Sequence, residues 1–96
     1  MAQEHDTDLI DGYRQEIDEI DTQLLRMLNR RAACALSIGK IKKRNNLPVF
    51  VPEREEQVVT RLLAENPGPV RPEAVRTVFR AIFSEMKALE EAENGD

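Results

Sequence analysis

The chain has 96 residues, a formal net charge of −4 and no tryptophan, so we expect one domain with an aliphatic core between packed helices. The acidic balance argues against general binding to nucleic acid, because no excess of cations attracts phosphates. The single cysteine, Cys34, has no partner for an intramolecular disulfide, which suits a reducing compartment.

The N-terminal segment is polar and acidic and lacks the apolar region of a signal peptide. No apolar run reaches the roughly 20 residues that span a membrane, so we expect a cytoplasmic protein. Residues 1–7 are predicted to form a disordered tail. Thr7 fits the N-cap of the helix that follows.

One helical pattern then runs from about Asp8 to Lys43, where Asn45 and Asn46 stop it. Apolar residues recur along it at steps of three and four, which is typical of a helix that packs along its whole length. They are Ile10, Tyr13, Ile17, Ile20, Leu24, Met27, Ile38 and Ile41.

Three cations interrupt this apolar stripe. At about 100° per residue, Arg31 and Lys42 point within about 20° of each other and of Leu24, and Arg14 lies at the edge. Each cation alone is compatible with a stem on apolar surface and a head in water. The shared central position of Arg31 and Lys42 instead favours a bound small anion, because buried cations need anionic partners.

The length of this helix also predicts a partner. About 36 residues make a rod about 54 Å long, whereas a compact domain of this size has a radius of gyration of about 13 Å. The helix must project beyond the core of its own chain. The simplest cover for its apolar face is the same helix of a second chain, so we expect a homodimer.

Residues 44–51 are predicted to be a loop, since Pro48 and the lack of a partner strand argue against a strand there. A second helix begins at Pro52 and ends near Glu65. Val51, at its N-cap, is a poor capping residue that costs about 1 kcal/mol relative to Asp or Ser. Its apolar stripe is Val58, Val59, Leu62 and Leu63, and Glu55 shares that face while Glu53 and Glu56 do not.

A turn at residues 66–69 leads to a third helix that opens at Pro72. Glu90 lies near the edge of its wide apolar face, and residues 93–96 are predicted to be an acidic tail. The face comprises Val75, Val78, Phe79, Ile82, Phe83, Met86 and Leu89. The chain is thus predicted to be all-α, with three helices, one of them very long.

Several chemistries are missing from the sequence. It has no glycine-rich phosphate loop, no cysteine pair and no HExxH motif, and its single histidine argues against a catalytic triad or a histidine metal site. Cys34 fits a small buried core residue better than a nucleophile, because no histidine is near to activate it. What remains on or beside the apolar faces is a set of charged residues: Arg14, Arg31, Lys42, Arg54, Glu55 and Glu90. Arg54 and Glu55 also fit a purely structural charge network.

These residues form a recognisable pattern. Arg14 to Arg31 reads R-x-x-I-D-x-I-D-x-x-L-L-x-x-L-x-x-R, followed by Ile38-Gly-Lys-Ile-Lys42, Pro48-Val-Phe50 and Pro52-Glu-Arg-Glu55. Over residues 8–92 the chain resembles the all-helical class of chorismate mutases. Both the free-standing enzymes and the mutase domain of bifunctional mutase–prephenate dehydratases share the pattern.

The resemblance implies an intertwined helical homodimer with two active sites, each built mostly by one chain. Arg14 of the partner chain would hold one carboxylate of the substrate and Arg31 the other. Lys42 would contact a carboxylate and the ether oxygen.

The remaining site residues come from the second and third helices. By the same resemblance, Glu55 and the backbone of Val51 would bind the ring hydroxyl, and Arg54 would support the charge network. Glu90 would lie on the other side of the ether oxygen, with Met86 in the pocket wall. A glutamate donates a hydrogen bond there only when it is protonated, so we predict a raised pKa for Glu90.

The implied reaction is the pericyclic rearrangement of chorismate to prephenate in aromatic amino acid biosynthesis (the shikimate pathway to phenylalanine and tyrosine). It needs no cofactor and no metal, in keeping with the motifs that the sequence lacks. Two alternatives stay open: an isochorismate pyruvate-lyase on the same scaffold, and a non-catalytic helical module whose long helix binds a partner protein.

Overall fold

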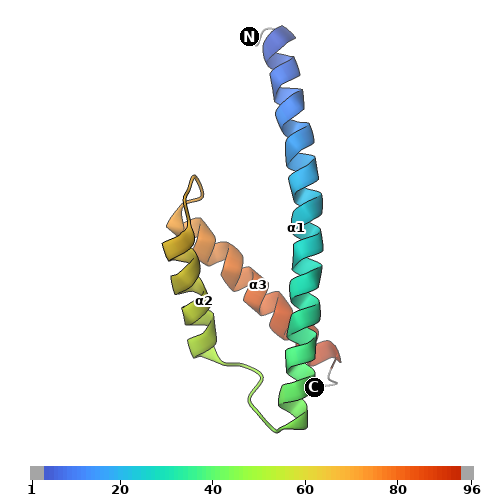
Figure 1. Ribbon diagram of the computed structural model, residues 1–96, viewed down its shortest axis with the longest axis vertical. Coiled ribbons are helices and arrows are strands. Elements are labelled where there is room, and N and C mark those ends of the chain that lie inside the picture. The colour runs from blue at the N-terminus through green and yellow to red at the C-terminus, as the bar shows by residue number, and fades with distance from the viewer. Residues whose placement is uncertain (1–3, 94–96) are drawn as a thin grey trace. The chain divides into compact units, whose positions relative to one another are not determined.

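The computed structural model describes residues 4–93, which form three α-helices and no strand (Figure 1). Helix α1 spans Glu4–Arg44, α2 spans Pro52–Glu65 and α3 spans Pro72–Glu93. This confirms the predicted all-α class. The chain divides after Ala33 into two units, which are described one at a time below.

Helix α1 begins earlier than the sequence predicted. It starts at Glu4 rather than near Thr7, so residues 4–7 are helical and the prediction of a tail over residues 1–7 is wrong for them. Neither proline nor glycine interrupts this segment, and Asp6 and Asp8 complement the positive end of the helix. Residues 1–3 and 94–96 of the two predicted tails lie outside the described part of the chain, and Glu93 closes α3.

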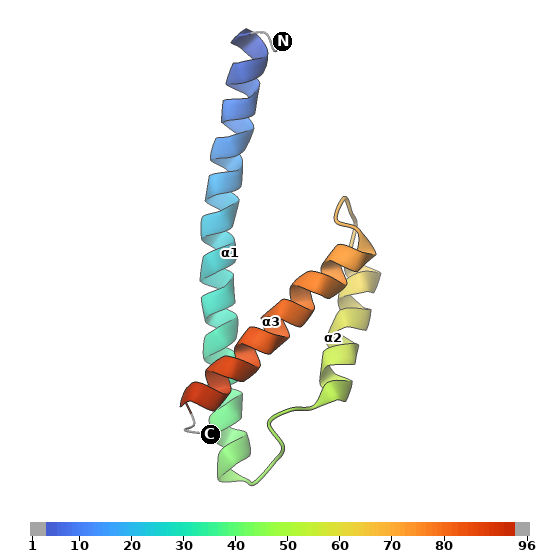
Figure 2. The same ribbon diagram turned by 180° about the vertical axis from the view of Figure 1, so that it is seen from behind.

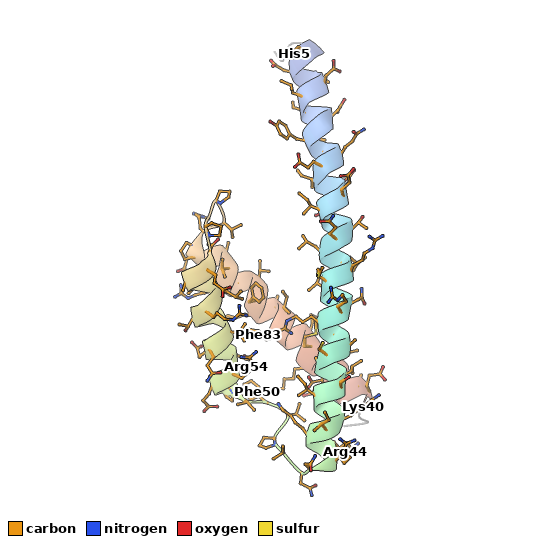
Figure 3. All side chains as sticks on the ribbon, viewed as in Figure 1. His5, Lys40, Arg44, Phe50, Arg54 and Phe83 are labelled. Atoms are coloured by element: carbon orange, nitrogen blue, oxygen red, sulfur yellow. The ribbon has the colours of Figure 1, made fainter. Side chains whose placement is uncertain are left out.

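The first unit consists of the N-terminal part of α1, whose apolar stripe is exposed in the single chain. Ile17 and Leu24 are 53% and 56% exposed to solvent. The side chains of this segment are drawn in Figure 3, below the label of His5. An apolar stripe of this length, left open along several turns, marks an interaction surface rather than an ordinary solvent face.

The second unit holds the core, where α2 packs against α3 (Figure 2). Val58 and Val59 of α2 and Phe83 of α3 are at most 9% exposed, and Leu62, Leu63 and Phe79 surround them. The Phe79 and Phe83 rings are 6.3 Å apart and tilted by 57°, a favourable arrangement for an aromatic pair. The predicted stripe of α2 is therefore confirmed.

Helix α2 covers only part of the apolar face that the sequence predicted for α3. Val75 and Phe83 are buried, but Val78 is 52% exposed. A single neighbouring helix covers one stripe, and Val78 falls about 60° from Val75 around the helix, on the side away from Phe83.

The end of α1 is closed by hydrogen bonds of the Schellman type. Asn46 has a left-handed φ of 56°, and the Leu47 amide donates to the Lys42 carbonyl at 2.8 Å while the Asn46 amide donates to that of Lys43 at 3.3 Å. This confirms that the two asparagines stop the helix. It also sets the direction in which the chain leaves Lys42.

The start of α2 has the weak cap that the sequence predicted. Val51 is extended and makes no side-chain capping bond, and Pro52 occupies the first turn. The Arg54 amide donates to the Val51 carbonyl at 3.0 Å. The backbone thus supplies the order at this helix start that a capping side chain would otherwise give.

The burial of Phe83 and the exposure of Val78 predict different losses of stability when each is replaced by alanine. Phe83→Ala is expected to lower the free energy of unfolding by about 3 kcal/mol, because it removes a buried ring and leaves a cavity between α2 and α3. Val78→Ala, at an exposed site on the same helix, should change it by about 0.5 kcal/mol or less. Urea unfolding followed by circular dichroism measures both, and equal losses would contradict the assigned core.

Candidate active site

Lys42 lies at the centre of the candidate site, in the last turn of α1. Its side chain is partly buried, and its ammonium group donates a hydrogen bond to the Val49 carbonyl oxygen at 3.1 Å. The Schellman turn brings the chain back beneath the helix end, so that residue 49 meets residue 42. The loop therefore fixes the position of a cation that the sequence placed on an apolar stripe.

Glu90 faces this cation from α3. Partial burial raises the pKa of its carboxyl group above the ordinary value, and the positive charge of Lys42 opposes that rise in pKa. The raised pKa was predicted from the sequence and is confirmed. Glu90 therefore keeps its proton to a higher pH than an exposed glutamate, and in that form its carboxyl donates a hydrogen bond.

The start of α2 adds polar groups to the same unit. Glu55 is partly buried whereas Glu53 and Glu56 are exposed, as the spacing predicted. Arg54 is exposed and is labelled in Figure 3 beside Phe50 at the beginning of α2. Met86 is partly buried one turn before Glu90 on α3, so it shares the Glu90 face of that helix.

Arg14 and Arg31 belong to the first unit. Arg14 is exposed and Arg31 is partly buried. The structure describes the first unit by itself. That these arginines share a binding site with Lys42 therefore remains a prediction. Cys34, which begins the second unit and which the sequence suggested as a small core residue, is an exposed free thiol in the single chain, because the face of α1 that it shares with the exposed Ile38 and Ile41 is uncovered.

Comparison with known proteins identifies the family. The profile described as chorismate mutase type II matches residues 13–91. The chain belongs to the chorismate mutase type II family. The match runs from the residue before Arg14 to the residue after Glu90, so it contains every candidate site residue.

Solved structures and curated relatives agree with this assignment. A chorismate mutase from Thermus thermophilus (form II) superposes with a TM-score of 0.84 at 38% identity, covering 85% of this chain and 93% of that one. The bifunctional chorismate mutase/prephenate dehydratase of Aquifex aeolicus is 46% identical over 80% of this chain. A 4-amino-4-deoxychorismate mutase from Streptomyces pristinaespiralis is 31% identical over 88% of the chain and 67% of its own length. This chain spans 22% of the length of the Aquifex relative.

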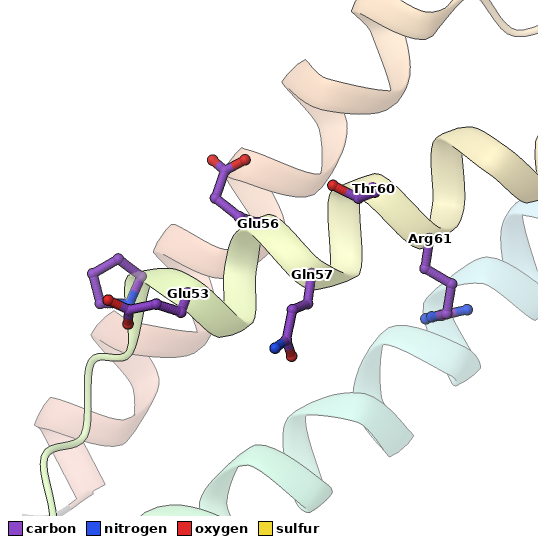
Figure 4. Close-up of a pocket in the computed structure, with 6 residues that line it drawn as sticks. Glu53, Glu56, Gln57, Thr60 and Arg61 are labelled. Atoms are coloured by element: carbon purple, nitrogen blue, oxygen red, sulfur yellow. The ribbon is translucent and has the colours of Figure 1, made fainter.

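A groove on α2 lies apart from the candidate active site described above. It has a volume of about 720 Å³ and is open to solvent (Figure 4). It contains none of the predicted site residues, because it lies on the face of α2 opposite Glu55 and Val58. Its lining consists of Pro52, Glu53, Glu56, Gln57, Thr60 and Arg61.

Sequence reasoning missed two contacts beside Lys42 and Glu90. One is the Val49 carbonyl that accepts from Lys42. The other joins Lys87 to Phe50, with the ammonium 4.5 Å from the ring centroid. The sequence predicted only a loop over residues 44–51, and Phe50 in that loop is 47% exposed. A backbone acceptor has no signature in a sequence, and a lysine one turn from Glu90 looks like any solvent-facing residue.

Among residues 4–93 no group of His, Cys, Asp and Glu side chains is arranged to hold a metal ion. None of the described helices is long and apolar enough to cross a membrane.

Proposed function

We propose that this chain catalyses the rearrangement of chorismate to prephenate, in the cytoplasm and as part of aromatic amino acid biosynthesis. The observation that carries the proposal is that Glu90, whose carboxyl has a raised pKa, lies within electrostatic reach of Lys42, in a member of the chorismate mutase type II family. When Glu90 is protonated, both side chains can donate hydrogen bonds to one oxygen atom.

The chemistry fits a site without a nucleophile. One C–O bond of chorismate breaks while one C–C bond forms within the same molecule, so no proton, metal or covalent intermediate is required. The site has to hold the compact conformer in which the reacting carbons meet. It also has to stabilise the negative charge that develops on the ether oxygen, which Lys42 and protonated Glu90 are suited to do.

The other residues are assigned to binding by the family resemblance. Arg31 and Arg14 of a partner chain each hold one carboxylate of the substrate in a bidentate pairing. Glu55 and the Val51 backbone bind the ring hydroxyl, and Arg54 balances the charge of Glu55. Met86 contributes apolar wall next to Glu90.

The role of Arg14 requires a homodimer, and the charges of α1 support one. Residues 4–21 carry eight carboxylates and one arginine, whereas residues 22–44 carry seven lysines and arginines and no carboxylate. Two such helices attract each other when they run antiparallel, because the acidic half of each then meets the basic half of the other. The exposed apolar stripe between these charges supplies the buried area.

The same pairing accounts for a shared site. Helix α1 runs from Glu4 to Arg44, so an antiparallel pair centred on its middle sets Arg14 opposite residue 34 of the partner. That position is about 4.5 Å along the axis from the partner's Arg31. Arg14 thereby reaches the site of the other chain, as the resemblance implies.

The direct test is incubation with chorismate and identification of prephenate. Loss of chorismate without prephenate, or no loss at all, would contradict the proposal, and the latter would favour a non-catalytic helical module. Isochorismate serves as the competing substrate for a lyase, with pyruvate and salicylate as its products. 4-Amino-4-deoxychorismate is tested as a third substrate, because one relative is named as a mutase of this compound. Of the three substrates, we expect chorismate to give the highest kcat/KM.

Glu90 predicts how turnover depends on pH. Its pKa is raised, and the protonated form is the donor, so kcat should fall as pH rises through that pKa. Glu90→Gln keeps a donor that does not titrate and should remove this fall. Measurement of kcat between pH 5 and 9 for both proteins checks it, and identical profiles would refute the role given to Glu90.

A further inference from the structure

The loop between α1 and α2 is tied to α3 by a cation and a ring. The Lys87 ammonium of α3 lies 4.5 Å from the centroid of the Phe50 ring, within the range in which a cation is attracted to the face of an aromatic ring. Phe50 is 47% exposed, so it is not anchored in the core between α2 and α3. Lys87 therefore contributes to holding the ring in place.

Along the chain, the Phe50–Lys87 contact lies between two hydrogen bonds of the loop and the start of α2. At the start of the loop, the Leu47 amide is bonded to the Lys42 carbonyl at 2.8 Å. The Val49 carbonyl is then bonded to the Lys42 ammonium at 3.1 Å. After Phe50 comes Val51, which makes no side-chain cap on α2.

The weak cap matters for this stretch. Because Val51 gives α2 no side-chain capping bond, only the bond from the Arg54 amide to the Val51 carbonyl fixes the helix start, and residues 49 and 50 depend on their neighbours for a fixed position. The Phe50 ring offers one apolar side chain in the middle of this stretch, and Lys87 attracts it to α3. A fixed Phe50 ring also restricts its two neighbours along the chain, the Val49 carbonyl and the start of α2 at Val51.

We propose that Lys87 is a positioning residue that holds Phe50, and with it residues 49–51, on α3. In this arrangement the Val49 carbonyl stays on the Lys42 ammonium, and the Val51 backbone is presented in one orientation. The consequence for substrate binding rests on the proposed function; the tether itself does not.

Lys87 has a second conceivable role, as a charge acting on Glu90 one turn further along α3. The raised pKa of Glu90 has burial as its main cause and the charge of Lys42 as the opposing one. Lys87 is absent from these causes. The tether and the charge effect differ in what they predict, since the tether needs the Phe50 ring and the charge effect does not.

The test compares Lys87→Met, which keeps the stem and removes the charge, with Lys87→Arg, which keeps a cation for the ring. Amide hydrogen exchange at Leu47 and Arg54, whose bonds to the Lys42 and Val51 carbonyls bracket the loop, should be faster by about two- to fivefold in Lys87→Met and near wild type in Lys87→Arg. Lys40→Met, at an exposed lysine of the same unit, is the control and should leave these amides unchanged. Equal exchange in Lys87→Met and wild type would overturn the tether.

Kinetics supply the second readout. A loosened loop must be ordered by the substrate as it binds, so Lys87→Met should raise KM by about two- to fivefold and leave kcat and its pH midpoint unchanged. Phe50→Leu should do the same, and the double variant should be no worse than either single one. Additive effects, or a shifted pH midpoint, would assign Lys87 to electrostatics instead. If the wild type does not convert chorismate, the proposed function fails while hydrogen exchange still decides the tether.

Discussion

Lys42→Ala is expected to lower kcat for chorismate by about 100- to 1000-fold, the usual loss when a preset donor to a developing oxyanion is removed. The structure holds the Lys42 ammonium in advance, through its bond to the Val49 carbonyl. A group fixed before the reaction does not have to be reorganised as charge develops on the ether oxygen. Such groups act on kcat more than on KM.

The matched control is Lys40→Ala, which removes an exposed lysine from the same helix end and should keep wild-type kcat. Lys42→Ala also removes the donor to Val49, so part of its effect comes from the loop. Lys87→Met measures that part, and because it is expected to raise KM about two- to fivefold and leave kcat unchanged, the loop does not account for the loss of kcat at Lys42. A Lys42→Ala enzyme within tenfold of wild type would refute the role of Lys42.

Much of the second unit was predictable from the sequence because its features are local. The stripe of α2, the partial burial of Glu55 and the stop at Asn45-Asn46 each follow from spacing or from the conformation that a single residue adopts. In these cases one helix and one neighbour determine the outcome. The raised pKa of Glu90 was instead predicted from the resemblance, in which a glutamate beside the ether oxygen donates a hydrogen bond only when it is protonated.

The misses have a different origin. The N-cap rule favoured Thr7, but the absence of proline and glycine between residues 4 and 7 let the helix extend to Glu4. Val78 and Cys34 are exposed because burial depends on which faces a neighbour covers, and periodicity does not reveal the neighbour. The Lys87–Phe50 contact joins residues 37 positions apart, and no local pattern relates them.

The long helix leads to the most demanding prediction, which concerns Arg14 and Arg31. Arg14→Ala and Arg31→Ala should each reduce kcat/KM strongly as homodimers, because each removes a bidentate partner of a substrate carboxylate at both sites. If Arg14 acts in the site of the other chain, a dimer with one chain of each variant contains one intact site and one site lacking both arginines. Random exchange makes about half of the dimers mixed, so an equimolar mixture should recover about a quarter of wild-type activity.

The control mixture is Arg31→Ala with Lys42→Ala. Both residues are assigned to the site of their own chain, so every site in a mixed dimer lacks one of them and no activity should return. Chains are exchanged by unfolding in urea and refolding together, and kcat/KM is measured before and after. Recovery in the first mixture and none in the second requires that Arg14 crosses between chains. If neither mixture recovers although mass spectrometry detects mixed dimers, Arg14 serves its own chain, and the excess length of α1 would need an explanation other than the delivery of an arginine.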